Sequence, residues 1–309
     1  MDKTIRIATR GSKLALWQAD YVAELLEAHG LKTEQVIIET KGDKILNKAL
    51  SKIGSKGVFT EELEEQLRKG EVDIAVHSAK DMQASLGDEF KLIAFTERET
   101  VNDVVVSTNP DLKIDKETSL VLATSSVRRV AMLKHYYPNI KTVDVRGNLQ
   151  TRMAKLEAGL GDGLVLAYAG VHRMEYDDKI VHHFPLDEFT PAAGQGSVAI
   201  EASVNMDAEV EKVIRKALNH GPTEYRLLAE RGFLKELQGG CSIPAFALAN
   251  LDGDEITITG GLTALDGSRV IRYEQKGSKE QAEELGRTVA KMVLEDGGKE
   301  MLEEIKGNL

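Results

Sequence analysis

Cysteine is almost absent from this chain: Cys241 is the only one among 309 residues. A single cysteine excludes an internal disulfide and fits a reducing compartment. No apolar run approaches the roughly 18 residues that suggest a membrane-spanning helix, and the start, MDKTIRIATR, has no apolar stretch behind basic residues. We therefore expect a cytoplasmic protein without a membrane span or a signal peptide.

Two kinds of ligand motif are also missing. The chain contains neither GxxxxGKS/T nor a GxGxxG that follows a strand-like segment, the usual phosphate-binding patterns. No cluster of Cys, His and Asp has the spacing of metal ligands. The sequence therefore predicts neither a nucleotide site nor a resident metal.

The charge of the chain is unevenly distributed. The formal net charge is −10, yet residues 121–173 contain eight Lys or Arg against three Asp or Glu. A basic segment in an acidic protein points to an anionic ligand in a confined site. Nucleic acid is a poorer match, because it usually requires a wholly basic domain and an aromatic platform. We therefore expect a small anionic ligand and no nucleic acid.

The first 200 residues alternate between strand-like and helix-like segments. Ile5 and Ile7 alternate with polar residues in TIRIATR, and a helical pattern follows from Ser12, a suitable N-cap, to Gly30, a stop signal. A second helix should begin at Thr60 as its cap and continue through TEELEEQLRKG. Segments such as VDIAVHS, SLVLATSS and DGLVLAYAG resemble buried strands. This order predicts an α/β fold with parallel sheets covered by helices.

The pattern changes at about residue 220. FALANLDGDEITITGGL and SRVIRYEQKG have the alternation and glycine turns of antiparallel strands, and a charged helical tail follows them. We expect a small α+β domain there. Residues 42–57 mix lysine and glycine without a clear period, which is typical of a mobile loop that could cover a site.

Several predicted strands end in basic tails. In parallel sheets the carboxyl ends of the strands face the ligand crevice. Arg10 ends the first strand, Lys80 follows VDIAVHS, and Arg146 and Arg173 follow two later strands. Arginine forms paired hydrogen bonds with planar carboxylates. We therefore expect these side chains to bind an anion together, although any one of them could be a solvated surface charge.

The segment ATSSVRR is a natural anion cradle. Thr124, Ser125 and Ser126 supply hydroxyl and N–H groups at a predicted helix start, and Arg128 and Arg129 follow directly. The segment RGNLQTR repeats this arrangement with Arg146, Gly147 and Arg152.

Asp81 is the candidate carboxylate of the same crevice. It follows Lys80 directly, and basic surroundings should keep it ionised. A permanent carboxylate suits the stabilisation of a cation better than the donation of a proton. The alternative is a helix cap or a turn residue. His77, at the end of the preceding strand, is expected to be buried and hydrogen-bonded.

Cys241 lies in an unusual setting, LKELQGGCSIPAF. Gly239 and Gly240 precede it and Pro244 follows, so the thiol is expected on a turn after a helix. A nucleophilic thiol needs a histidine or another means of lowering its pKa, and the sequence indicates no such partner. From residue chemistry alone, a reactive thiol and a small buried apolar residue both remain open.

Eight segments occur together in the order and spacing of one known family. They are TRGSKLALWQA, KGD, SKGVFTEEL, AVHSAKD, ATSSVRR, VRGNLQTR, AAGQGSVAIE and GGCSIP. From about residue 5 to residue 245 the chain resembles the porphobilinogen deaminases, also called hydroxymethylbilane synthases. The C-terminal tail is compatible with the family and less distinctive.

The resemblance implies three domains. Two are doubly wound α/β lobes similar to those of type II periplasmic binding proteins, and the third is a small α+β C-terminal domain. The first lobe should comprise residues 1–97 and 194–218, the second residues 98–193, and the C-terminal domain, which carries the cysteine, residues 219–309.

The resemblance also implies a transferase of tetrapyrrole (haem) biosynthesis. Four porphobilinogen molecules join head to tail, each losing ammonia, to give hydroxymethylbilane. The primer is a dipyrromethane cofactor held through a thioether, and by resemblance Cys241 is its anchor. Such an anchor has to be reachable on a turn but needs no neighbouring histidine at each turnover, because the bond persists.

By the same resemblance Asp81 is the catalytic carboxylate, which stabilises the cationic azafulvene formed when ammonia leaves. The pyrrole carboxylates imply basic and polar binding positions. For the cofactor these are Cys241, Lys80, Thr124, Ser126, Arg128, Arg129, Arg146 and Gly147. For the substrate they are Arg10, Gln18, Arg146, Arg152, Arg173 and Gln195, and the covering loop contributes Lys52, Lys56 and Phe59. The expected partner is porphobilinogen, with no membrane or nucleic acid, and we expect a monomer.

Three positions depart from the family pattern. Gln83 stands where many members have proline, which could loosen the turn after Asp81. Asn102 replaces an arginine, and Gln238 stands where glutamate is common before the GGC segment. None of the three is assigned to the chemistry.

Two other functions remain open on the residues alone. A binding protein of the same fold for a di- or tricarboxylate would leave Cys241 and Asp81 without a role, and a fold does not by itself determine function. A cysteine-dependent transferase with a transient intermediate would need a histidine close to Cys241, and none of the seven histidines is an obvious candidate.

Overall fold

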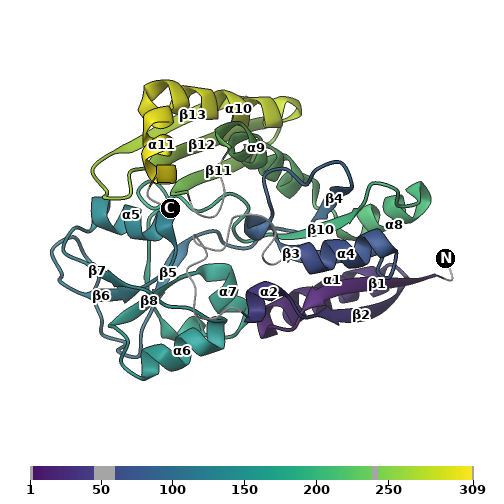
Figure 1. Ribbon diagram of the computed structural model, residues 1–309, viewed down its shortest axis with the longest axis horizontal. Helices are drawn as coiled ribbons and strands as arrows, with labels where there is room; N and C mark the ends of the chain where they lie inside the picture. The colour runs from purple at the N-terminus through teal and green to yellow at the C-terminus, as the bar shows by residue number, and fades with distance from the viewer. Residues whose placement is uncertain (1–2, 45–59, 239–242, 308–309) are drawn as a thin grey trace.

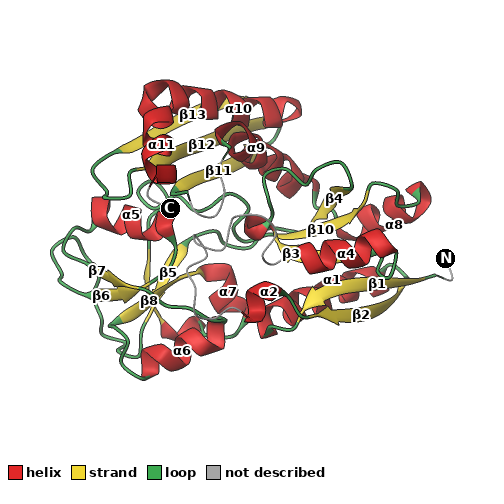
Figure 2. Ribbon diagram, in the orientation of Figure 1, coloured by secondary structure: helices red, strands yellow, loops and turns green. Residues whose placement is uncertain are grey.

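The chain folds around three β-sheets that form three packed regions (Figure 1). The computed structural model describes residues 3–44, 60–238 and 243–307. Two five-stranded sheets lie side by side, and a three-stranded sheet with its own helices packs beside both, at the top of Figure 2. The expected fold class, two α/β lobes with a small α+β C-terminal domain, is confirmed.

The first sheet and its helices combine the N-terminal segment with a later one. Their elements are β1 (Thr4–Arg10), α1 (Lys13–Ala28), β2 (Lys32–Ile38), α2 (Lys41–Lys44), α4 (Glu61–Lys69), β3 (Ile74–Ser78), η1 (Ala79–Asp81), β4 (Phe90–Phe95), β10 (Val198–Ser203) and α8 (Ala208–Leu218). The strand order is β2-β1-β3-β10-β4. Ile5 and Ile7 pack against Val22 of α1 on one face, and Ala8 packs against Leu63 of α4 on the other.

The second sheet is continuous in sequence. Its elements, with the helices that cover it, are β5 (Asp103–Val106), β6 (Val121–Ala123), α5 (Val127–Tyr136), β7 (Lys141–Val143), α6 (Leu149–Glu157), β8 (Gly163–Ala167), α7 (Tyr168–Arg173), η2 (Asp177–Lys179) and β9 (Ile180–His183). The strand order is β7-β6-β8-β5-β9. Met132 of α5 packs on one face and Met153 of α6 on the other.

Both lobes correct the expectation of purely parallel sheets. β10 runs antiparallel to β3 and β4, and β5 runs antiparallel to β8 and β9. These two strands directly follow the places where the chain crosses between the lobes, residues 184–197 and 96–102. Each of these strands therefore enters its sheet from the other lobe rather than through a helical crossover within the same sheet, so the connection that makes neighbouring strands parallel is missing for it.

The C-terminal region is an antiparallel sheet covered by helices. Its elements are α9 (Gly221–Leu237), β11 (Ala245–Asp252), β12 (Glu255–Thr263), β13 (Val270–Ser278), η3 (Lys279–Gln281), α10 (Ala282–Val293), η4 (Leu294–Gly298) and α11 (Lys299–Gly307). Gly286 lets α10 approach α9 closely, since a Cβ there would lie 1.9 Å from the carbonyl oxygen of Ala229. Within the described residues, no helix is long and apolar enough to cross a membrane.

Local sequence signals correspond to several observed helix ends. The hydroxyl of Ser12 caps α1, and Gly30, with a φ of 77°, follows its end. Thr60 lies at the N-cap position of α4, as expected, although its side chain makes no capping hydrogen bond there. The acidic first turn, including Glu61 and Glu62, favours that helix end through the helix dipole. Residues 42–44 of the expected covering loop belong to α2, and the rest of it lies outside the described residues.

Candidate active site

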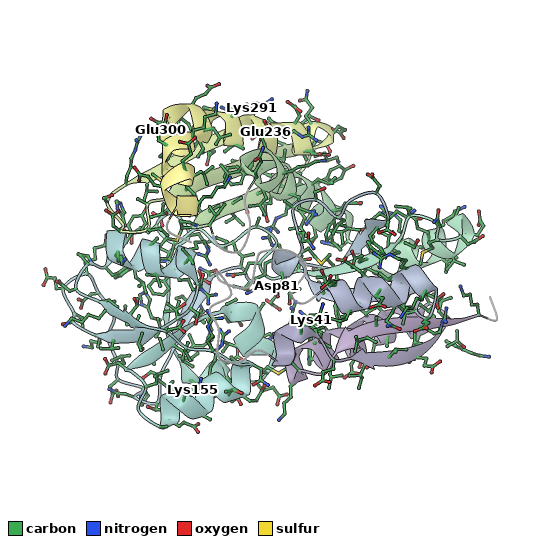
Figure 3. The ribbon with its side chains drawn as sticks, viewed as in Figure 1. Lys41, Asp81, Lys155, Glu236, Lys291 and Glu300 are labelled. Carbon is green, nitrogen blue, oxygen red and sulfur yellow. The ribbon has the colours of Figure 1, made fainter. Side chains whose placement is uncertain are left out.

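Asp81 lies near the centre of the molecule, where the three regions meet (Figure 3). It is an exposed residue at the end of η1, which directly follows β3. Gly194, in the second crossing, packs closely against the backbone of Ala79 and Lys80 in this turn. At its φ of 79°, a Cβ would lie 2.8 Å from the backbone nitrogen of Lys80. The position of the Asp81 carboxylate therefore depends on the crossing between the lobes.

Charged side chains that belong to the second lobe affect the pKa of Lys80. Burial lowers the pKa of Lys80 from its ordinary value of 10.5 to about 8. The Asp81 carboxylate opposes this decrease, while the guanidinium groups of Arg129 and Arg128 add to it. Lys80, after the carboxyl end of β3, and the arginines at the start of α5 therefore lie close enough to interact electrostatically. This agrees with the expectation that basic residues after the strands lie near one another.

The hydroxyl groups of ATSSVRR serve the helix start itself. The Ser126 hydroxyl accepts a hydrogen bond of 3.5 Å from the Arg129 N–H, which caps α5. The Thr124 hydroxyl accepts a hydrogen bond of 3.3 Å from the Ser126 N–H. Ser125 exchanges hydrogen bonds with the backbone of Val145, which links α5 to the segment after β7. These contacts give the segment from Thr124 to Arg129 a defined shape.

Arg128 and Arg129 are buried, and both bind Asp103. Arg128 Nη2 lies 2.7 Å from Asp103 Oδ2, and Arg129 Nη2 lies 2.7 Å from Oδ1. Burial by itself would raise the pKa of Asp103, but the two arginine charges lower it far below its ordinary value. Asp103 is therefore ionised, and the two arginines have a carboxylate partner within the protein.

Sequence reasoning missed Asp103. The signal for it was its place at the start of DVVV, a strand in which all four residues are buried. A carboxylate in such a strand needs a cationic partner, because an unpaired buried charge is very unfavourable. The nearby pair Arg128 and Arg129 could have been proposed as that partner.

The segment RGNLQTR adds further cations at the start of α6. Gly147 has a φ of 111°, a conformation that favours glycine, and its carbonyl accepts a hydrogen bond of 2.8 Å from Arg152 Nε. Burial lowers the pKa of Arg152, Arg129 and Arg146 lower it further, and Asp81 opposes the decrease. The structure therefore brings Arg152 into electrostatic contact with groups from both lobes.

Gln18 and Gln195, two glutamines predicted to bind the substrate, are buried and form hydrogen bonds with residues of other segments. Gln18 of α1 donates a hydrogen bond of 2.9 Å to the hydroxyl of Ser78, the residue before η1. Gln195, in the second crossing, donates to the carbonyl of Val101 at 2.7 Å and to Asp103 Oδ1 at 3.0 Å. Arg10 ends β1, as expected.

Arg173 differs in position from the sequence prediction. It is the last residue of α7 rather than a residue at a strand end. Its Nη2 donates a hydrogen bond of 2.9 Å to the carbonyl of Gly196, and its guanidinium lies 5.0 Å from the centre of the Trp17 ring. Burial lowers the pKa of Arg173, and Glu99 opposes this effect. The side chain thus bridges α7, α1 and the second crossing.

Four predicted residues lie outside the described residues: Cys241, Lys52, Lys56 and Phe59. The helix that leads to Cys241, α9, ends at Leu237, and the next residue, Gln238, has a left-handed conformation. Arg231 of this helix donates a hydrogen bond of 2.8 Å to the carbonyl of Gln83. This contact holds the segment after Asp81 at the position where the family proline is missing.

His77 and Asn102 both make hydrogen bonds within the protein. His77 is buried, and its Nε2 lies 2.9 Å from Glu201 Oε2, so the expected structural role is confirmed. Asn102 donates a hydrogen bond of 3.0 Å to the carbonyl of Phe184, a neutral contact where an arginine is usual. Among the described residues, no group of three His, Cys, Asp or Glu side chains could hold a metal ion.

Comparison with known proteins identifies the family. Residues 5–212 match the porphobilinogen deaminase dipyromethane cofactor binding domain, and residues 225–295 match the porphobilinogen deaminase C-terminal domain. The chain belongs to the porphobilinogen deaminase family.

Its similarity to family members extends over the whole chain. It is 53% identical to the porphobilinogen deaminase of Cytophaga hutchinsonii, over 100% of this chain and 99% of the relative. It is also 53% identical to that of Desulfosudis oleivorans, over 98% of each chain. Among solved structures, the lipoprotein Tp32 of Treponema pallidum is 12% identical, with a TM-score of 0.46 over 72% of this chain and 93% of that one.

Membership of the porphobilinogen deaminase family establishes the activity. The chain is a transferase that polymerises porphobilinogen in tetrapyrrole biosynthesis and uses a dipyrromethane cofactor. This result decides against the two alternatives that the residues had left open, a carboxylate-binding protein and a transferase with a transient cysteine intermediate.

Proposed function

We propose that Asp81 is the carboxylate that stabilises the positive charge formed when porphobilinogen loses ammonia. The observation that carries this proposal is that the Asp81 carboxylate interacts electrostatically with cations of both lobes. It opposes the decrease in the pKa of Lys80 in its own lobe and of Arg152 in the other. Its exposure leaves the carboxylate accessible to a ligand between these cations. A fixed carboxylate next to the pyrrole N–H lowers the free energy of the developing cation.

The charge balance around Asp81 fits an acidic ligand. Each pyrrole ring of the substrate and the cofactor carries an acetate and a propionate. The interacting cations are Lys80, Arg128, Arg129, Arg146 and Arg152, and the nearby carboxylates are Asp81, Asp103 and Asp144. Cations are in excess, and burial makes their mutual repulsion stronger than it would be in water. Ligand carboxylates would relieve that repulsion.

The residues around Asp81 therefore suit the dipyrromethane cofactor. When bound, it supplies the free pyrrole carbon to which porphobilinogen adds. Residues proposed to hold its acidic side chains are Lys80, Thr124, Ser126, Arg128, Arg129, Arg146 and Gly147, with Cys241 as the thioether anchor. The contact between Arg231 of α9 and Gln83 supports this arrangement, because it places the helix that leads to Cys241 beside the segment after Asp81.

The incoming porphobilinogen is proposed to meet a second set of residues. They are Arg10, Gln18, Arg146, Arg152, Arg173 and Gln195, and Lys52, Lys56 and Phe59 are proposed to cover the site. Gln18 and Arg173 support this role through their contacts with Ser78 and the second crossing, which border η1. Their task is to orient the carboxylates of the substrate and to limit access of water.

The domain division expected from the resemblance is also proposed. The three sheets support lobes of residues 1–97 with 194–218 and of residues 98–193, followed by a C-terminal domain of residues 219–309. We further propose a cytoplasmic monomer; the single cysteine suits a reducing compartment.

Mass spectrometry of the intact protein tests the anchor. Purified protein should exceed its sequence mass by two linked pyrrole units, and Cys241→Ser should remove the excess while the circular dichroism spectrum stays unchanged. An active wild-type protein with the unmodified sequence mass would refute Cys241 as the anchor.

A further inference from the structure

We infer that Asp103 is a positioning residue that holds Arg128 and Arg129 in one orientation and connects both to Gln195 in the crossing between the lobes. This inference rests on the proposed role of the two arginines in binding the carboxylates of cofactor and substrate. Asp103 itself is fully buried, so it acts through the arginines rather than on a ligand.

The two carboxylate oxygens of Asp103 are used differently. Oδ2 accepts a hydrogen bond of 2.7 Å from Arg128 Nη2. Oδ1 accepts two from Arg129, one of 3.1 Å from Nε and one of 2.7 Å from Nη2. Both hydrogen bonds from this guanidinium edge converge on one oxygen, which places Oδ1 close to the guanidinium plane and holds that edge of Arg129 against Asp103. Asp103 therefore determines the direction in which Arg129 presents its remaining N–H groups.

Backbone carbonyls hold the other edges of the two arginines. Arg128 Nη1 donates to the carbonyl of Thr190 at 3.0 Å, and Arg129 Nη1 donates to that of Val165 at 2.8 Å. With both edges held, neither guanidinium can turn without breaking a hydrogen bond. Donors that are already oriented bind a carboxylate with a smaller loss of side-chain entropy.

Gln195 connects this cluster to the relative position of the lobes. Its side-chain nitrogen donates to Asp103 Oδ1 at 3.0 Å and to the carbonyl of Val101 at 2.7 Å. Asp103 begins β5 immediately after the first crossing, and Gln195 belongs to the second. A displacement of one crossing against the other would therefore disturb the oxygen that orients Arg129.

Stability alone does not account for a carboxylate at this position. The desolvation of a buried ion pair offsets much of its attraction, and well-packed apolar replacements are often neutral or stabilising. One carboxylate shared by two arginines also leaves a net positive charge. That residual charge is useful for binding an anion and unfavourable in a core.

Asp103→Asn tests the inference directly. The substitution preserves the size of the side chain, removes its charge and places an amide NH2 group opposite a guanidinium donor. We expect the KM for porphobilinogen to rise roughly tenfold to a hundredfold, with a smaller change in kcat. The fraction of purified protein that carries the cofactor mass should fall as well.

Asp73→Asn is the matched control. Asp73 also pairs with an arginine, at 3.0 Å from Arg6 Nε, and its side chain is only 8% exposed. It lies just before β3, at the end of that strand opposite to Asp81. This control should lower the unfolding temperature and leave KM and cofactor content unchanged. The same result for Asp103→Asn would make Asp103 merely structural and overturn the inference.

Asp103→Glu decides the matter if the Asn variant does not fold. Glutamate keeps the charge but displaces the guanidinium groups by one methylene, so we expect a folded protein with a raised KM. An unchanged KM, or failure of both variants to fold, would overturn the positioning role. Arg129→Met tests the underlying proposal separately: an unchanged KM there would refute the binding role of Arg129 itself.

Discussion

Arg98 and Glu230 form a buried ion pair, with 2.6 Å between Arg98 Nη1 and Glu230 Oε1. Arg98 belongs to the first crossing between the lobes, whereas Glu230 belongs to α9 of the C-terminal region. The same carboxylate accepts hydrogen bonds from the N–H groups of Gly194, at 2.7 Å, and Ala249, at 2.9 Å. One buried side chain therefore connects both crossings to the C-terminal region and supports the turn that carries Asp81.

Arg98→Met should destabilise the protein strongly, because it leaves Glu230 buried without its cation. We expect the free energy of unfolding in urea to fall by about 3–5 kcal/mol. The double variant Arg98→Met with Glu230→Gln should lose less, since no unpaired charge remains. A loss below about 1 kcal/mol, as for an exposed pair, would contradict the importance of this contact.

Asp81→Asn should preserve the fold and reduce turnover. The residue is exposed, so removing its charge should leave the unfolding temperature nearly unchanged. Loss of a charge that stabilises the developing cation should lower kcat by roughly a hundredfold to a thousandfold. Steady-state kinetics and thermal unfolding measure both quantities. Turnover close to that of the wild type would exclude Asp81 from the chemistry.

Lys80 should make ligand binding depend on pH near 8. Burial lowers the pKa of Lys80 to about 8, so the ammonium loses its proton as the pH rises through this value. We expect KM for porphobilinogen to increase above about pH 8. Lys80→Arg, which keeps its charge at high pH, should flatten this increase. An unchanged pH profile in the arginine variant would assign the dependence to another group.

Unfolding does not explain the expected increase in KM, because the lowered pKa of Lys80 makes the folded protein more stable as the pH rises. The folded pKa of Lys80 lies below its ordinary value of 10.5, so the unfolded chain binds more protons between about pH 8 and 10.5. The contribution of this group to stability therefore rises with pH through that window. Denaturant titrations of wild type and Lys80→Met at the two ends of the window measure this contribution.

Gly194→Ala should disturb the turn that carries Asp81. The new Cβ would require a left-handed alanine and would lie 2.8 Å from the backbone of Ala79 and Lys80. We expect a loss of about 1–3 kcal/mol of stability and a fall in kcat of roughly tenfold or more. Gly253→Ala is the control, because Gly253 has a φ of 59° with no atom within 4 Å of the added Cβ. If both variants kept full turnover, the packing of Gly194 would have no catalytic role.

Much of the site was predictable because it depends on local rules. Arg10 ends β1, Lys80 and Asp81 follow β3, and the carboxyl ends of parallel strands meet at one edge of a sheet. The cap at Ser126 was likewise visible as a hydroxyl residue before a helix. The position of Arg173 was wrong, because a short helix, α7, separates it from the end of β8.

The sequence by itself determined the type of the strongly periodic segments, the placement of basic residues after strand-like segments and the family, since these follow from hydrophobic periodicity and from motifs of adjacent residues. Only the tertiary structure decided that β5 and β10 run antiparallel and that Asp103 lies between Arg128 and Arg129. Asp103 is separated from these arginines by more than twenty residues. A carboxylate pairs with whichever cation the packing brings within hydrogen-bond distance, and residue order alone does not specify that distance.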